Sequence, residues 1–414
     1  MTAPGRLHLF QAFGVELEYM IVDRDSLQVR PIADELLKAK LGEYGGDFEN
    51  GMVTWSNELV THVIELKSTK PEPDLPALSR EFAENVKEIN QVLESWNAML
   101  LPTAAHPWMD PLTESRLWPH DNNEVYEAYN RIFDCRGHGW SNLQSTHLNL
   151  PFYDDEEFAR LHAAIRAILP LLPALCASSP ILGGQPTGLL DTRLHYYRTN
   201  QRAIPSITGK VIPEAVFSKR QYFNTIYERI KADIAPFDSD SILDPIWVNS
   251  RGAIPRFDRG SIEIRIMDVQ ECPSVDLAIQ ALVIETIRAL AQEKFSTTQD
   301  QMQLWTENLA ALLEEVGRGG PEVPINEPDY LAVFGLGTGA TAGQVWEHIH
   351  QQLTKQTGKL DTWNSTILAL LNKGPLARRI LNALAGSSDP DPMTSVYRSL
   401  ADCLATDRMF SGKI

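Results

Sequence analysis

The 414-residue sequence predicts an α+β fold: a mainly antiparallel sheet lined with carboxylates, helices on its outer face, and a helical C-terminal extension. Two observations carry this prediction. Before about residue 270, short segments alternate apolar and polar residues with the two-residue period of a strand. After Pro273 the apolar pattern is almost wholly helical. Strands followed by a run of helices are typical of α+β folds.

The first predicted strand, residues 13–19, carries two glutamates two positions apart. Glu16 and Glu18 alternate with Val15 and Leu17, so both carboxylates point to one face of an otherwise apolar strand. Such a pair repels unless something positive lies between them, and a divalent cation with oxygen ligands is the simplest remedy. An edge strand with both glutamates in water is the alternative.

A second pair of carboxylates lies in residues 55–66. Glu58 and Glu65 are seven positions apart, which places them on opposite faces of a straight strand. They can reach one site only if a turn or bulge lies between them, and we expect it near Thr61 and His62.

A third segment, residues 144–151, places His147 and Asn149 on one face of a predicted strand. A lone histidine at such a position is more often a core residue than a ligand. Because other predicted strands of the chain carry carboxylates on one face in the same way, a functional site is favoured here.

The fourth strand, residues 261–268, alternates Ile262, Ile264 and Ile266 with Glu263, Arg265 and Met267. We interpret Glu263 as a metal ligand and Arg265 as a phosphate clamp, because the planar guanidinium fork matches phosphate oxygens. An ion pair facing solvent is the alternative.

Helices are predicted around and after these strands. The predicted ranges, after one that begins at Ala33, are 72–97, 123–133, 155–177, 191–202, 214–234, 274–293, 300–316, 341–356, 362–372, 375–385 and 392–405. Because the candidate site residues spread from 16 to 265, we expect one catalytic domain over residues 1–290 and a helical extension, residues 291–414, packed on it.

Composition narrows the partners and the compartment. The chain has 37 basic and 54 acidic residues, a net charge of −17, which disfavours nucleic acid and anionic membranes as partners. Four cysteines without a C-x-x-C pair, no apolar stretch long enough to span a membrane and no leader-like start predict a cytoplasmic protein. A homo-oligomer is left open.

In their order and spacing, these four segments resemble the glutamate–cysteine ligase family, and within it the second bacterial branch of carboxylate–amine ligases related to glutamine synthetase. Residues 105–108, 178–193 and 268–270 also fit, and the resemblance covers about residues 10–290. The segment after His147 departs from it, since family members often carry a His-Val-His-type strand followed by glycine.

The resemblance implies a glutamine-synthetase-like fold and an ATP-dependent ligase. It would join glutamate to an amine, cysteine first among the candidates, through an acyl phosphate. The absence of P-loop and Rossmann motifs agrees with a nucleotide held through Mg²⁺, or Mn²⁺ in its place. A guanidino-type phosphotransferase and an inactive nucleotide-binding homologue are the alternatives.

The resemblance also implies roles for individual residues. Arg265 is the predicted catalytic residue, and Arg193, Arg256 and Asn149 are predicted to bind the amino-acid substrates. The predicted metal ligands are Glu16, Glu18, Glu58, Glu65, His147 and Glu263.

Overall fold

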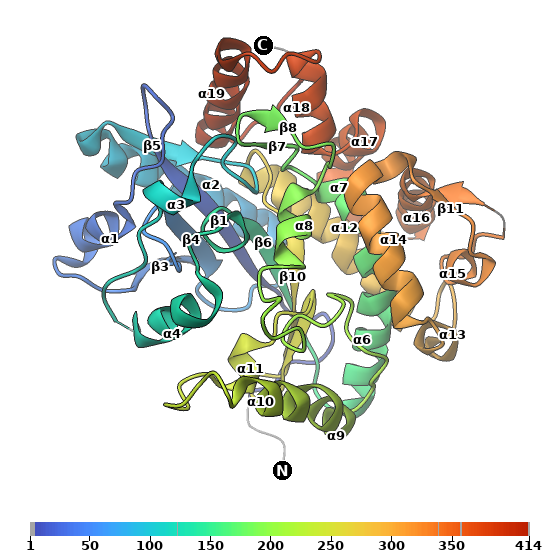
Figure 1. Cartoon of the computed structure of the whole chain (residues 1–414). Helices are drawn as coiled ribbons and strands as arrows, with labels where there is room; N and C mark the ends of the chain where they lie inside the picture. Colours follow the sequence, from blue (N-terminus) through green and yellow to red (C-terminus); the bar gives the residue numbers. More distant parts are fainter. Residues whose placement is uncertain (1–4, 122, 338, 357, 413–414) are drawn as a thin grey trace.

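The computed structural model describes residues 5–121, 123–337, 339–356 and 358–412. An eight-stranded sheet lies at its centre, in the order β2-β3-β4-β1-β6-β10-β9 with β5 paired to β1, and all neighbouring strands are antiparallel (Figure 1). Its strands are β1 (Gly14–Asp23), β2 (Asp47–Asn50), β3 (Val53–Asn57), β4 (Val63–Ser68), β5 (Ala98–Leu101), β6 (Ser145–Pro151), β9 (Ala253–Arg256) and β10 (Ser261–Asp268). Two small hairpins pair β7 (Ile181–Leu182) with β8 (Gln185–Pro186) and β11 (Pro324–Ile325) with β12 (Ala340–Thr341).

Helices surround this sheet and continue to the C-terminal end. In the first part of the chain they are α1 (Ala33–Leu41), α2 (Leu75–Leu93), η1 (Glu94–Trp96), α3 (Pro111–Glu114), α4 (Asn123–Phe133), α5 (His138–Ser141), α6 (Asp155–Ile168), η2 (Leu169–Leu171), α7 (Pro173–Cys176), α8 (Thr192–Tyr197), α9 (Lys219–Tyr222), η3 (Phe223–Tyr227), α10 (Glu228–Ile234) and α11 (Pro245–Val248). Then follow α12 (Pro273–Ala291), α13 (Thr298–Met302), α14 (Thr306–Gly319), η4 (Gly320–Glu322), α15 (Pro328–Ala332), α16 (Ala342–Gln356), η5 (Gly358–Trp363), α17 (Asn364–Lys373), α18 (Leu376–Leu384) and α19 (Pro390–Thr406). Figure 1 shows α18 and α19 at one end of the molecule and α9 to α11 at the other.

The two faces of the sheet differ in polarity. On β1, Val15, Leu17 and Tyr19 are fully buried and belong to the main hydrophobic cluster, which also includes residues of α2 and α12. The glutamates between them point to the opposite face. The period-two pattern therefore sorts the strand into a core side and a polar side.

Two irregularities in the sheet decide which side chains reach the polar face. Residues 61 and 62 form the predicted turn between β3 and β4. In β10 the register shifts between Ile264 and Met267, so two residues oppose one on β6. Met267 pairs with Thr146 and thus points to the same side as Ile264. The predicted placement of Met267 beside Glu263 and Arg265 is wrong, because the bulge reverses the alternation.

The sequence places helices well but not always their ends. Residues 123–133 form a helix as predicted. Other predicted helices are shorter or divided: residues 192–197 replace 191–202, and residues 300–316 belong to two helices. The 155–177 segment is a 14-residue helix followed by two short elements that contain Pro170 and Pro173. Proline removes an amide donor and crowds the preceding turn, which explains the last division.

The architecture confirms the predicted α+β fold with its mainly antiparallel sheet and helical C-terminal region. The boundary between residues 290 and 291 stays a prediction. Among the described helices, none is both long enough and apolar enough to cross a membrane.

Candidate active site

All ten predicted site residues line two adjoining cavities on the polar face of the sheet. The larger has a volume of about 550 Å³ and is lined by Glu16, Glu58, Glu65, His147, Asn149, Arg256, Glu263 and Arg265 among others. The smaller, of about 200 Å³, is lined by Glu18, Glu58, His147, Arg193 and Arg265 among others. Glu58, His147 and Arg265 therefore stand at the junction of the two.

Strand register brings these side chains together from distant parts of the chain. Glu16 on β1 lies directly opposite His147 on β6, and Glu18 lies opposite Glu65 on β4. Paired residues on adjacent antiparallel strands point to the same face, with their Cβ atoms about 5 Å apart. Glu58 follows the end of β3 and reaches the cavities from the loop between β3 and β4.

His147 lies at the centre of the carboxylate group. Its Nδ1 lies 2.7 Å from Glu16 Oε2 and 3.8 Å from Glu263 Oε1, and its Nε2 lies 3.7 Å from Glu18 Oε1. The Ser145 hydroxyl lies 2.8 Å from the same Nε2, and the Ser145 amide donates to Glu18 at 2.7 Å. The imidazole thus bridges three carboxylates from two strands, β1 and β10.

The charges of Glu16 and His147 are coupled. Burial pushes the pKa of Glu16 upward, but the hydrogen bond and charge of His147 outweigh it and lower that pKa to about 2. Burial alone would lower the pKa of His147. Its hydrogen bond to Glu16 and the charges of Glu16 and Glu18 outweigh burial, so the pKa is raised. The contact with Glu16 thus favours the charged form of His147, whose positive charge would offset part of the negative charge of the cluster.

For two further glutamates, Glu58 and Glu65, the nearby positive charges do not outweigh burial and the neighbouring carboxylates. Burial and the nearby Glu18 raise the pKa of Glu58 to about 7. Burial, with Glu16 and Glu58 close by, raises the pKa of Glu65 well above its ordinary value, although Lys67 Nζ lies 3.8 Å away. Carboxyls whose charged form is disfavoured by burial and by neighbouring carboxylates are typical of a site that accepts a cation.

The donor set fits a hard divalent cation. Two triads each place one donor atom per residue within 4.8 Å of the others: Glu16, His147 and Glu263, and Glu18, Glu65 and His147. Carboxylate oxygens suit Mg²⁺ and Mn²⁺, and the imidazole nitrogen favours Mn²⁺ more than Mg²⁺. A metal ion would bind the neutral imidazole, so metal binding would compete with the proton that the contact between His147 and Glu16 favours.

Arg265 stands beside the carboxylates on β10. Its Nε lies 2.9 Å from Glu263 Oε1, and Arg256 Nε donates to Glu263 Oε2 at 3.4 Å. Arg265 is about 29% exposed, so part of its guanidinium faces the cavities. The glutamate thus orients two guanidinium groups that a phosphate could engage.

Arg193 reaches the smaller cavity from α8. Its Nη2 donates to the backbone carbonyl of Arg265 at 2.9 Å, and its Nη1 lies 3.6 Å from Asp268 Oδ1. Asp268 is fully buried and accepts from the Ser178 amide and the Ser179 hydroxyl. Arg193 Nη1 is buried and faces the Asp268 carboxylate, although it forms no hydrogen bond with a described residue.

Sequence reasoning missed several residues of this site. The smaller cavity is walled by the aromatic side chains of Tyr129, Trp140, Tyr197 and Trp247, and Trp247 is 60% exposed. Asp268 follows Arg265 by three positions, so only the bulge gives it access to the polar side. The aromatic residues lie on helices, where no periodic pattern separates them from core residues.

Comparison with known proteins now identifies the family. The model of glutamate-cysteine ligase family 2 matches residues 12–316, about three quarters of the chain. The chain belongs to this family. The family prediction is thereby confirmed.

Individual relatives agree with this assignment. The chain is 38% identical over 283 residues to an uncharacterized protein of Archaeoglobus fulgidus, covering 68% of this chain and 75% of that one. It is 29% identical over 293 residues to a Bradyrhizobium sp. (strain ORS 278) protein named "Putative glutamate--cysteine ligase 2", covering 69% of this chain and 62% of that one. The crystal structure of Francisella tularensis glutamate–cysteine ligase in complex with AMP has the same fold, with a TM-score of 0.61 at 13% identity over 100% of this chain and 91% of that one.

Proposed function

We propose that this protein is an ATP-dependent carboxylate–amine ligase. The observation that carries the proposal is the pair of overlapping metal triads, centred on His147 and flanked by Arg265 at the junction of two cavities. Such a junction suits a reaction in which a nucleotide and a second substrate meet over metal ions. The AMP bound to the Francisella tularensis ligase supports an adenine nucleotide for this fold.

The larger cavity is the proposed nucleotide site. Lys67, Lys70, Arg256 and Arg259 line it, and their charges favour a polyphosphate. The carboxylates would hold Mg²⁺ or Mn²⁺ between them and the phosphates, and the bound metal would neutralise phosphate charge. Arg265 would stabilise the charge on the transferred γ-phosphoryl group, which is the main protein contribution in phosphoryl transfer.

The smaller cavity is the proposed amino-acid site. Arg193 lines this cavity, and its guanidinium would bind a substrate carboxylate. Asn149 lines the larger cavity, not the smaller one, and donates to Glu16 Oε1 at 3.0 Å. Its proposed contact is therefore with the part of the substrate that reaches from the smaller cavity into the larger one. Family membership favours glutamate as the acid and cysteine as the amine.

The proposed reaction has two steps, phosphoryl transfer to the acid and attack by the amine. An oxygen of the substrate carboxylate attacks the γ-phosphorus of ATP, the bond to the β,γ-bridging oxygen breaks, and ADP leaves. The amine nitrogen attacks the acyl carbon, inorganic phosphate leaves with the acyl-bond electrons, and the nitrogen loses its proton to form an amide.

The alternatives differ in what accepts the phosphoryl group. A guanidino-type phosphotransferase would transfer it to nitrogen, and an inactive homologue would bind nucleotide without turnover. An assay of ADP and phosphate release with Mg²⁺, against panels of acids and amines, separates the three. We expect release of both products only when acid and amine are present together. ADP without phosphate, or binding without turnover, would overturn the proposal. Amino acids as small-molecule substrates and a cytoplasmic location stay predictions.

A further inference from the structure

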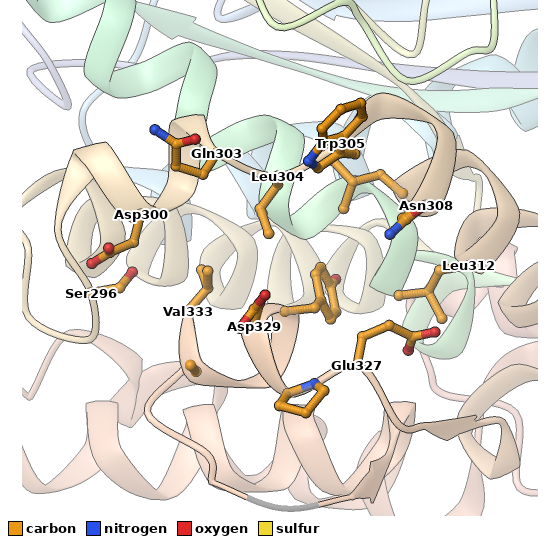
Figure 2. Close-up of a pocket in the computed structure, with 14 residues that line it drawn as sticks. Ser296, Asp300, Gln303, Leu304, Trp305, Asn308, Leu312, Glu327, Asp329 and Val333 are labelled. Carbon is orange, nitrogen blue, oxygen red and sulfur yellow. The ribbon is translucent and has the colours of Figure 1, made fainter.

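A separate cavity, remote from these residues in sequence, lies among α13, α14 and α15. Its volume is about 560 Å³, and buried Leu304, Leu309 and Tyr330 form part of its apolar lining (Figure 2). One wall, residues 327–333, lies beyond residue 316, where the match to the family ends. The proposed ligase reaction makes no use of this cavity.

An exposed indole stands over the cavity. Trp305 is 73% exposed and makes no ring–ring or cation–π contact with any described residue. Figure 2 shows it across the cavity from Asp329. A large aromatic side chain that meets water next to an apolar hollow is typical of a binding surface.

The rim of the cavity carries uncompensated negative charge. Asp300, Glu327 and Asp329 line it, and no Lys or Arg does among the described residues. Asp300 accepts from Thr297, and Glu327 accepts from the amide of Asn326, but none of the three forms an ion pair with a described residue. The rim thus has three carboxylates and, among the described residues, no basic side chain that neutralises them.

We propose that this cavity binds a small organic ammonium ion with an apolar body. The ammonium group would lie between the carboxylates and the face of Trp305, where an indole attracts a cation. The apolar body would cover the leucines and Tyr330. The volume lies within the usual range for small-ligand sites, about 300–1,000 Å³. The net charge of −17 attracts cations and repels anions of the same shape.

The probe is 2-phenylethylammonium, with 2-phenylethanol as a neutral control of nearly the same shape. Calorimetric titration of the full chain at low salt should give a Kd of about 0.1–1 mM for the cation. We expect binding at least about ten-fold weaker for the alcohol, and weaker binding of the cation at high salt. Equal affinity for cation and alcohol, or no binding of the cation, would overturn the proposal.

Two cavity variants test whether the cation binds at this position. Trp305→Ala and the double variant Glu327→Gln/Asp329→Asn should each weaken binding about five-fold or more, since they remove the aromatic face and two of the charges. The matched control Glu347→Gln/Asp402→Asn removes two exposed carboxylates elsewhere and should leave the affinity unchanged. Unfolding curves check that each variant is folded. Affinity retained in both cavity variants would place the probe elsewhere and refute the site. These titrations need no turnover, so their outcome is independent of the ligase proposal.

Discussion

Replacing Glu58 by glutamine should stabilise the metal-free protein at high pH. The pKa of this carboxyl rises from its ordinary value of 4.5 to about 7 through burial and the nearby Glu18. In the unfolded chain it ionises near its ordinary pKa, so the folded state loses stability as pH rises from 4.5 toward 7. At about 1.4 kcal/mol for each pH unit, the full loss is about 3 kcal/mol. Since Glu58 is partly exposed to the cavities, we expect about 1–3 kcal/mol.

Denaturant unfolding of both proteins in chelator measures this difference. The Glu58→Gln variant should be more stable than the wild type at pH 8, and the advantage should disappear near pH 4, where the wild-type carboxyl is protonated in both states. Glu347→Gln, an exposed glutamate on α16, is the matched control and should show no such pH dependence. A constant difference between Glu58→Gln and wild type from pH 4 to pH 8 would refute the argument, since it would mean that Glu58 is not held near neutrality by its neighbours.

Three further predictions concern the reaction and the core. Arg265→Lys keeps the charge but loses the fork, so kcat should fall by more than about ten-fold with little change in the KM for ATP; a silent variant would mean an ordinary pair with Glu263. Glu16→Gln and Glu18→Gln should each weaken Mn²⁺ binding, measured by calorimetry, while circular dichroism stays unchanged. Arg379→Met should cost about 3–5 kcal/mol of unfolding free energy because it strands the fully buried Glu271, and Glu271→Gln in the same chain should restore part of it; equal losses in single and double variants would contradict this.

The strand prediction succeeded where a local pattern carries the information. Alternation of Glu16 and Glu18 with Val15 and Leu17 is enough to assign a strand with one polar face. The turn between Glu58 and Glu65 could also be predicted, because a straight strand would have separated the two carboxylates. Family resemblance supplied the remaining residue roles, which stay predictions.

Other features depend on contacts that no local pattern records. The bulge in β10 turns Met267 toward the core, and Asp268 then pairs with Ser145 on the side of the candidate site. The division of residues 300–316 into two helices also escaped the sequence pattern, and it is this break that exposes Trp305 beside the cavity.

The sequence by itself determined the carboxylate-bearing strands, the helical C-terminal region and the family. The tertiary structure decided which charges meet: Glu16 lies opposite His147, 131 positions away, and their contact lowers the pKa of Glu16 and raises that of His147 against the effect of burial. It also decided that the Arg193 guanidinium on α8 faces the buried Asp268 carboxylate, 3.6 Å away. The physical reason is that side-chain period is a local property of the backbone, whereas a pKa or an unpaired donor depends on every segment that folding brings within a few ångströms.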